Sequence, residues 1–338
     1  MGLLTRQTVS QSRTGIGPSA FPLGFLLPSP LTPSSAAMNG DQEAPSQAMG
    51  AELGSLSLEF TRLSQLTGNP KYFDAIQRIT DQFEKHQNET RYPGLFPVWV
   101  NPLEEIFGKD HTFTFGGMSD SLYEYFPKQY MLLGGLVDQY KNLYEKAIEA
   151  AKTHLFFRPL HPENQDILIS GTVGTFGLQP DGQHLVCFAG GMVAIGAKIF
   201  NRTDELGVAR KLVDGCIWTY DSMPTGIMPE GFSLVPCKDP EDCTWSTERW
   251  HREVLHQNAN GEDIDATDVI RDDHLPIGYT KISDRRFLLR FVQIHYFFLL
   301  SPIYTIFVQS FPLHSLSTHL LSTKSLPIHF APQANEPS

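Results

Sequence analysis

The chain has 338 residues, enough for one large domain or two ordinary ones, and 41% of them are apolar, which is ample for a hydrophobic core. Its formal net charge of −11 argues against nucleic acid and against an anionic membrane surface as partners. Uncharged polar ligands such as sugars remain compatible with this composition.

The first fifty residues are rich in Ser, Pro, Gly and Ala, with Pro22, Pro28 and Pro30 close together. Such a composition neither holds a helix nor buries much surface, so we predict that residues 1–50 are disordered. Their apolar stretch, Phe21–Leu27, is too short to span a bilayer, and the early Gly and Pro argue against a signal peptide.

From Glu52 onward the pattern becomes helical. Apolar residues recur at steps of three and four as far as Leu66, and again from Phe73 to Phe83. The helix-breaking stretch Thr67–Pro70 separates the two runs. This pattern predicts a helical hairpin.

Two further hairpins of the same kind follow. Their helices are predicted over residues 119–136 and 140–155, and over residues 185–200 and 206–220. The three hairpins begin near Glu52, Asp120 and His184, at nearly even spacing. Repeated helical hairpins of even pitch indicate an all-α toroid of paired helices, with two stacked domains as the alternative.

A toroid would bring the polar residues that begin its first helices together at one end. The connections over residues 92–115 and 167–183 carry alternating apolar residues and glycines, so we expect them to form short β-hairpins at that end.

The last 48 residues, 291–338, differ again: no Asp or Glu follows Arg290 until Glu336, and Lys324 is the only Lys or Arg. One interpretation is a transmembrane span, because residues 291–311 are nearly all apolar. We favour the other, in which this tail lies outside the native domain and arises from read-through at an exon boundary.

Asp120 follows two glycines at the predicted start of a helix, and Glu124 lies one turn further along the same face. The simplest interpretation is that Asp120 satisfies free N–H groups of the first helical turn. The functional interpretation is that both carboxylates point into one polar space near Tyr123 and Tyr125, as glycoside hydrolysis requires. Pro127 should kink this helix.

The four cysteines lack the CxxC spacing of a metal site, and they are Cys187, Cys216, Cys237 and Cys243. They are either two disulfides of a secretory protein or buried thiols. The sequons at Asn88 and Asn201 give weak support to the secretory interpretation.

The stretch Phe113–Tyr130 closely resembles the signature of the glycoside hydrolase family 47 α-1,2-mannosidases. Further stretches that agree with this family in order and spacing are Ala51–Phe60, His184–Phe188, Thr225–Glu230 and Ser283–Arg290. The resemblance covers residues 51–290 and implies a fragment, lacking both ends, of the family's catalytic domain. It implies an incomplete (α/α)7 barrel, a bound Ca²⁺, and a glycosidase that hydrolyses α-1,2-linked mannose with inversion.

The resemblance also assigns roles to residues. Asp120 and Glu230 match acidic active-site positions and are the candidate catalytic residues; the alternative for Glu230 is a structural carboxylate at the barrel rim. The candidate substrate-binding residues are Glu52, Met118, Glu124, His184 and Arg290. On its sequence context alone, His184 would be interpreted as a partly buried, hydrogen-bonded histidine. Cys187 and Cys216 match the family's disulfide, which would join the helices of the third hairpin.

Met118 occupies a position where the family's single-mannose-trimming enzymes of the endoplasmic reticulum carry Arg. An Arg makes fixed, multidentate hydrogen bonds to one glycan branch and Met does not, so Met118 indicates relaxed branch choice. The implied partner is a high-mannose N-glycan or glycoprotein, and the implied compartment is the secretory pathway.

The sequence also departs from the family pattern. The family's general acid lies in a Phe-Glu-x-x-Ile-Arg motif that does not occur upstream of Glu52, and Phe291-Val292 follows Arg290 in place of an Arg-Pro-Glu motif. The family's Ca²⁺-binding Thr is also missing, so we assign no metal ligand. We therefore expect little or no turnover from this polypeptide. The alternatives are a non-catalytic mannose-glycan-binding relative that acts in glycoprotein degradation, and a chain that does not fold.

Overall fold

The computed structural model of the chain describes residues 44–108, 111–259 and 264–286. Contacts between residues divide the chain into two units, Met1–Phe291 and Val292–Ser338. The predicted disorder of residues 1–43 and both interpretations of the tail lie outside the described residues. Residues 44–50, which we also expected to be disordered, contain a short strand and the first residue of a helix, because that strand pairs with a strand about fifty residues further along the chain.

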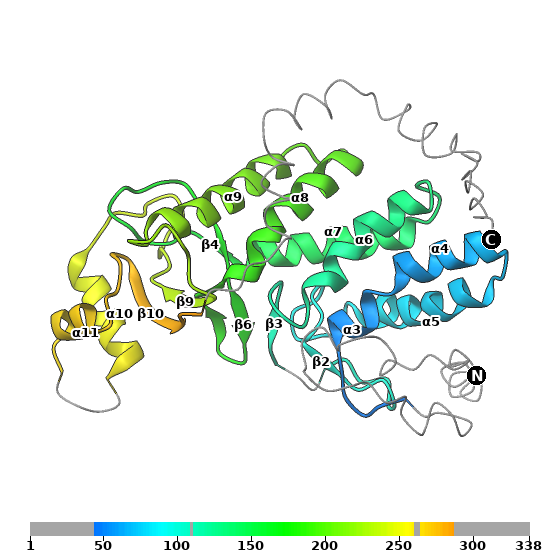
Figure 1. Cartoon of the computed structure of the whole chain (residues 1–338), viewed down its shortest axis with the longest axis horizontal. Coiled ribbons are helices and arrows are strands. Elements are labelled where there is room, and N and C mark those ends of the chain that lie inside the picture. The colour runs from blue at the N-terminus through cyan, green and yellow to red at the C-terminus, as the bar shows by residue number, and fades with distance from the viewer. Residues whose placement is uncertain (1–43, 109–110, 260–263, 287–338) are drawn as a thin grey trace, which may run out of the picture. The chain divides into compact units, whose positions relative to one another are not determined.

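Helices dominate the described part of the chain (Figure 1). In chain order they are α3 (Gly50–Gly54), α4 (Ser57–Thr67), α5 (Lys71–His86), α6 (Asp120–Leu132), α7 (Asp138–His154), the 3₁₀ helix η3 (His184–Cys187), α8 (Phe188–Ile199), α9 (Glu205–Asp221), α10 (Thr247–Asn258) and α11 (Ala266–Asp272). The pairs α4/α5, α6/α7 and α8/α9 are the three predicted hairpins, and each pair packs together.

The predicted break between the first two helices agrees with the structure. Helix α4 ends at Thr67, because Gly68 adopts the left-handed conformation (φ 67°), and α5 begins directly after Pro70. Helix α6 ends four residues earlier than predicted, at Leu132, because Gly134 and Gly135 both have positive φ. It continues as one helix through Pro127.

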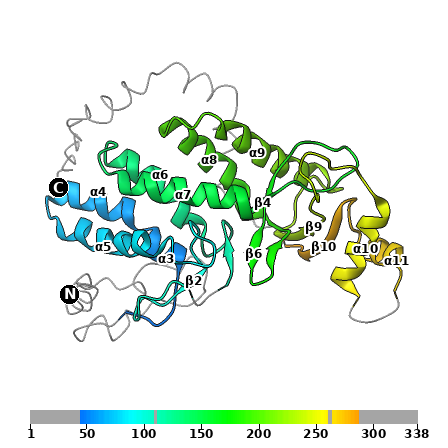
Figure 2. The same ribbon diagram turned by 180° about the vertical axis from the view of Figure 1, so that it is seen from behind.

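The first helices of successive pairs also contact one another. Helix α6 touches α4 on one side and α8 on the other, and Figures 1 and 2 show the three pairs side by side in both views. A buried hydrogen bond from Gln129 Nε2 to Thr61 Oγ1 (2.6 Å) links α6 to α4. A β-carbon at Gly54 would overlap Leu122, so glycine permits the close approach of α3 to α6.

The strands are short and antiparallel. They are β1 (Ala48–Met49), β2 (Trp99–Val100), β3 (Phe113–Thr114), β4 (Phe156–Phe157), β5 (Ile169–Ser170), β6 (Thr172–Gly174), β7 (Gly177–Gln179), β8 (Asp181–Gln183), β9 (Gly231–Leu234) and β10 (Tyr279–Asp284). Among the described residues they form four small sheets, in the orders β1–β2, β4–β5, β3–β6–β7 and β8–β9–β10. The prediction of a helix-rich fold is confirmed, and the two three-stranded sheets position the site described below.

A hydrophobic core joins α9 to β9, α10 and β10. Trp218 of α9 stacks on Tyr279 of β10 with ring centroids 5.6 Å apart. Trp250 of α10 donates from Nε1 to the carbonyl of Tyr279 (2.8 Å). This core fixes the C-terminal end of α9 against the β8–β9–β10 sheet.

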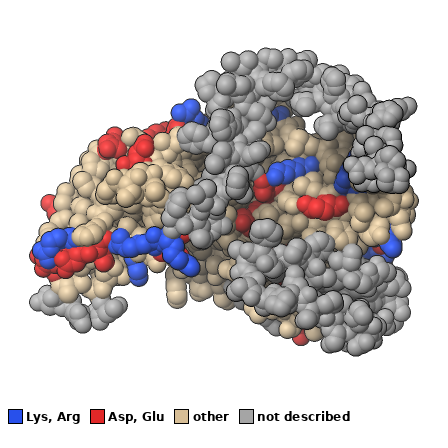
Figure 3. Space-filling view, viewed as in Figure 1, with Lys and Arg blue, Asp and Glu red and all other residues tan. Residues whose placement is uncertain are grey.

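Acidic and basic side chains lie next to one another on the face drawn in Figure 3. On α11, for example, Arg271 pairs with Asp268 (2.9 Å) and with Asp272 (3.0 Å). Within the three described ranges, no helix has both the length and the apolar content that crossing a bilayer requires.

Candidate active site

The pairing of β8 with β9 places His184 beside Glu230. Gln183 is opposite Gly231 in this pair, and the next backbone hydrogen bond runs from the N–H of His184 to the carbonyl of Glu230 (3.0 Å). The two side chains also contact each other, with His184 Nδ1 3.2 Å from Glu230 Oε1. Both are buried: 2% of the His184 side chain is exposed, and 9% of that of Glu230.

Tyr220, near the end of α9, contacts the opposite side of the His184 ring. Its hydroxyl lies 2.5 Å from His184 Nε2. Burial raises the pKa of Tyr220, and the negative charge of Glu230 raises it further. The phenol is therefore protonated at neutral pH, and the imidazole is held between a carboxylate and a neutral hydroxyl.

The disulfide Cys187–Cys216 holds these elements together, with Cα atoms 5.7 Å apart. Cys187 lies three residues after His184, and Cys216 lies one helical turn before Tyr220 on the same face of α9. Cys237 and Cys243 form a second, local disulfide. The buried-thiol interpretation of the four cysteines was therefore wrong.

Asp120 is the first residue of α6 and is half-buried. The turn before it is tight: the N–H groups of Ser119 and Asp120 both donate to the carbonyl of Gly116 (3.2 and 3.0 Å). Met118 has a left-handed backbone (φ 74°), which is rare for a side chain other than Gly. A carboxylate in the first turn of a helix faces the positive end of the helix dipole.

The Met118 turn also contacts helix α3, which carries Glu52. The carbonyl of Met118 accepts a hydrogen bond from the N–H of Ala51 (2.9 Å). Glu52 is half-buried, and burial raises the pKa of its carboxyl, although a hydrogen bond with the backbone of Met49 opposes this effect. The starts of α3 and α6 are thus joined directly, and each presents an acidic residue.

Gln183 connects this turn to the histidine. The N–H of Gly117 donates to Gln183 Oε1 (3.0 Å), and a β-carbon at Gly116 would overlap the same side-chain amide. A continuous series of contacts therefore runs from the start of α3, through the turn before Asp120, to Gln183 and His184. These contacts link the starts of α3, α6 and η3.

The side chains of three predicted site residues are not among these contacts. Glu124 forms an ion pair with Lys128 of the same helix, 2.5 Å away, and the neighbouring Tyr125 donates to Glu59 (2.8 Å). Met118 is 45% exposed. Arg290 lies outside the described residues.

Sequence reasoning missed Tyr220 and Gln183. A signal for Tyr220 was present, because the disulfide implied for Cys187 and Cys216 brings the last turns of α9 next to His184. Gln183 directly precedes the histidine, but its role depends on contact with the turn at Gly116. The sequence pattern does not predict that this turn lies beside Gln183.

The described residues contain no group of three or more His, Cys, Asp or Glu side chains arranged to hold a metal ion. The residues present here do not fit a resident cation by themselves, and we derive no chemical step through one. Carboxylates, a buried imidazole and a phenol hydroxyl, arranged at the ends of helices, suit a ligand with many hydroxyl groups.

Comparisons with known proteins give one consistent result. The model of glycosyl hydrolase family 47 matches residues 22–290. This match begins inside the segment 1–50 that we had placed outside the family region.

Among the similar proteins is the endoplasmic reticulum mannosyl-oligosaccharide 1,2-alpha-mannosidase of Mus musculus, 34% identical over 194 residues, which are 57% of this chain and 29% of that protein. Another is the mannosyl-oligosaccharide alpha-1,2-mannosidase 1B of Aspergillus phoenicis, 37% identical over 185 residues, or 54% of this chain and 36% of that protein. The matched region thus spans about a third of the length of these relatives.

The solved structure of the alpha-1,2-mannosidase from Trichoderma reesei is similar, with a TM-score of 0.52 at 23% identity. The similarity covers 73% of this chain and 57% of that one. At this identity the likeness establishes a shared helical fold.

Proposed function

Because the chain belongs to glycosyl hydrolase family 47, we propose that it is part of a mannosyl-oligosaccharide 1,2-α-mannosidase. Its site would take the terminal α-1,2-linked mannose of a high-mannose N-glycan. The observation that carries this proposal is the series of contacts that joins the turn before Asp120 to the buried His184–Glu230 pair (3.2 Å). Both lie inside the region that the family model matches.

Asp120 is the group that we assign to the reacting sugar. An inverting glycosidase needs one carboxyl that protonates the leaving oxygen and another that activates a water molecule on the opposite face, about 6.5–9.5 Å away. Asp120 is half-buried at the start of a helix, where backbone N–H groups stabilise a negative side chain. A carboxylate in this position is suited to accept a proton or to stabilise a developing positive charge.

His184 would act by positioning Glu230 and Tyr220. The carboxylate and the hydroxyl lie on the two nitrogen atoms of the ring, at 3.2 and 2.5 Å, so they fix its orientation and its tautomer. We propose that the ring holds the Glu230 carboxylate and the Tyr220 hydroxyl where they hydrogen-bond the sugar. Glu230 remains one of the two acidic residues of the site, and Glu52 is the half-buried acid at its other side.

The finer architecture belongs to this proposal as well. We interpret α4/α5, α6/α7 and α8/α9 as consecutive helix pairs of an (α/α)7 barrel, with α4, α6 and α8 on the inside. The mutual contacts of these three helices support that assignment.

Ca²⁺ would assist sugar binding in a complete domain of this family. Dialysis against a chelator, followed by binding assays with and without added Ca²⁺, tests whether sugar binding by this chain depends on Ca²⁺.

Two disulfides and two sequons support a secretory location, because disulfides persist in oxidising compartments. The mouse relative is named for the endoplasmic reticulum.

For branch choice, Met118 is the residue to test. Met118→Arg is expected to narrow the set of high-mannose glycans that the protein retains on a glycan array, because a guanidinium makes fixed hydrogen bonds that a thioether does not.

The proposal is tested by titrating α-1,2-mannobiose and α-1,3-mannobiose into the 338-residue protein and by following release of mannose. We expect selective binding of the α-1,2 disaccharide, with little turnover. Absence of binding by a cooperatively folded sample would contradict the proposal. Turnover that Asp120→Asn abolishes would support the role of Asp120 and would overturn our expectation that this polypeptide is nearly inactive.

The second candidate function is glycan recognition without hydrolysis, in a relative that acts in glycoprotein degradation. It is favoured by the ion pair of Glu124 with Lys128, which occupies one of the two carboxylates that we predicted to share a polar space with substrate. The same titration discriminates the two functions. Tight retention of high-mannose glycans, with no hydrolysis even at high enzyme concentration, is the result that selects this candidate.

A further inference from the structure

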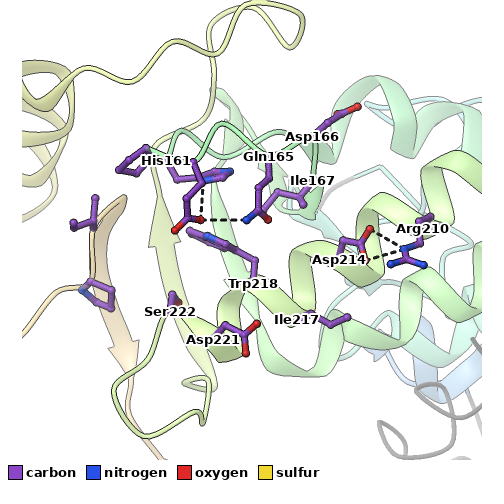
Figure 4. A pocket seen from close by; sticks show the side chains of 14 residues that line it. His161, Gln165, Asp166, Ile167, Arg210, Asp214, Ile217, Trp218, Asp221 and Ser222 are labelled. Carbon is purple, nitrogen blue, oxygen red and sulfur yellow. Dashed lines mark hydrogen bonds and ion pairs between the residues drawn. The ribbon is translucent and has the colours of Figure 1, made fainter. Parts of the chain in front are cut away.

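A cavity separate from the candidate active site lies on one face of α9. Its volume is about 710 Å³, within the range of ligand pockets. Arg210, Asp214, Trp218 and Asp221 follow one another along α9 at steps of three and four, so they share a face of the helix (Figure 4). The opposite wall comes from residues 161–167 and from the pair Pro276–Ile277.

His161 is the buried polar group of this cavity. Only 1% of the residue is exposed, and neither ring nitrogen makes a hydrogen bond of good geometry, although the backbone of Gln165 lies close enough to interact with the ring. One face of the ring leans on Trp218, with centroids 5.2 Å apart, and Nδ1 lies 3.6 Å from Glu163 Oε2. A buried imidazole whose hydrogen bonding is this poor is costly, which indicates that a ligand supplies a better partner.

Burial also lowers the pKa of His161, so the ring is neutral at neutral pH. The carboxylate of Glu163 favours the tautomer with a hydrogen on Nδ1, which leaves Nε2 as an acceptor. The missing partner of this nitrogen is therefore a donor.

The carboxylates of the cavity also indicate a ligand that donates hydrogen bonds. Asp214 is neutralised by Arg210 (2.8 Å), and Asp166 by Lys211 (2.7 Å). In the described part of the chain, Glu163 and Asp221 make no ion pair with a Lys or Arg side chain. Gln165 donates to Glu163 (3.2 Å) but carries no charge.

Arg158 is a further cation beside this wall, and its guanidinium is already hydrogen-bonded. Its guanidinium donates to the carbonyls of Asn164, Gln165 and Pro240. The cavity thus has an excess of acceptors and of negative charge. Apolar side chains such as Ile167, Ile217 and Pro276 supply the rest of the lining.

We propose that this cavity binds a basic side chain, an ammonium or guanidinium group on an aliphatic stem, presented by a polypeptide partner. The charged end would lie between Glu163 and Asp221 and donate to His161 Nε2, and the stem would pack on the apolar lining. A metal ion is a poorer candidate, because no three potential ligands of the described residues are arranged around one point. A neutral sugar is also a poorer candidate, because Trp218 is buried and already packs on His161 and Tyr279, so it is poorly placed to stack on a sugar.

The test uses the 338-residue protein and two capped tripeptides, acetyl-Gly-Lys-Gly-amide and its Gln counterpart. Binding is followed by the NMR signals of the His161 ring. The lysine peptide is expected to bind with a dissociation constant in the millimolar range and to shift these signals, and added salt should weaken it. Glu163→Gln and Asp221→Asn, both at exposed positions, should each weaken binding at least fivefold.

Asp166→Asn is the matched control, because Asp166 lines the same cavity but is already paired with Lys211. Its effect should stay below twofold. Equal binding of the Gln peptide, a His161 shift with methyl α-mannoside but not with the lysine peptide, or no shift in any titration would each overturn the proposal. None of these outcomes depends on mannose binding at His184, so the two proposals stand or fall separately.

Discussion

His184 and Glu230 are joined twice, by a backbone hydrogen bond of 3.0 Å and by a side-chain contact of 3.2 Å between Nδ1 and Oε1. The two contacts have one cause, because the register of β8 and β9 continues into the residues that follow β8 and precede β9. A site residue supplied by a strand end is held more rigidly than one on a free loop. The predictions below follow from this arrangement and from the elements around it.

Replacing the carboxylate of Glu230 should reduce the stability of the fold measurably. Glu230→Gln is expected to lower the free energy of unfolding by about 1–3 kcal/mol, because it removes the charge that faces a buried imidazole. Urea unfolding measures the loss. Glu89→Gln is the control, since Glu89 also contacts a histidine (His86, 2.7 Å) but is 65% exposed, and it should cost below about 1 kcal/mol. Equal losses of unfolding free energy in the two variants would show that burial does not make the His184–Glu230 pair more stabilising than the exposed one.

The two disulfides should differ in their effect on the site. Cys187 and Cys216 are 29 residues apart, so replacing both by Ser should cost about 3–4 kcal/mol in a chain-entropy treatment. Cys237 and Cys243 are 6 residues apart, and the corresponding cost is about 2 kcal/mol. Mannobiose titration should show at least a threefold weaker affinity for the first double variant and no change for the second. A loss of binding in the second would contradict our placement of the site.

The left-handed backbone of Met118 makes a prediction about substitutions. Met118→Val should destabilise by about 1–3 kcal/mol, because a β-branched side chain is poorly tolerated at positive φ. Met118→Gly should be neutral or stabilise by up to about 1 kcal/mol, since glycine adopts this conformation without strain. Thermal unfolding of the two variants provides the comparison, and equal midpoints would exclude strain at this turn.

Stability should fall at alkaline pH. Burial raises the pKa of Tyr123, Tyr144 and Tyr279, whereas tyrosines of the unfolded chain titrate near 10. The folded state therefore holds these protons more tightly, so the contribution is fully present below about pH 10 and is lost as the pH rises toward the folded-state values. Urea midpoints between about pH 9 and pH 11 should decline, and the decline should be smaller in Tyr279→Phe. A flat profile would contradict this prediction.

Much of the helical framework could be predicted from the sequence. Apolar residues at steps of three and four located the three hairpins, because helices with one buried face must carry that pattern. The ends were predictable where Gly68 and Pro70 interrupt the pattern. The early end of α6 was not, since it depends on the left-handed backbone of Gly134 and Gly135, and a glycine alone does not reveal its φ.

The site was predictable in part. Asp120 and His184 lie in recognisable local sequences at the starts of helices. The contact of His184 with Tyr220 was not predictable, because it depends on how η3 packs against α9 and on the register of β8 with β9. Non-local pairing of short strands leaves almost no periodic signal in the chain. The same limit explains why β1, two residues long, was assigned to a disordered segment.

The most direct test of the proposed site is the NMR response of the His184 ring to α-1,2-mannobiose. If the sugar binds between Asp120 and the His184–Glu230 pair, the His184 signals should shift on titration, while those of His86, which stacks on Phe107, should stay unchanged. Asp120→Asn should weaken the interaction at least tenfold in the same titration. A saturable interaction that leaves His184 unshifted, or that Asp120→Asn does not affect, would contradict the placement of the mannose site.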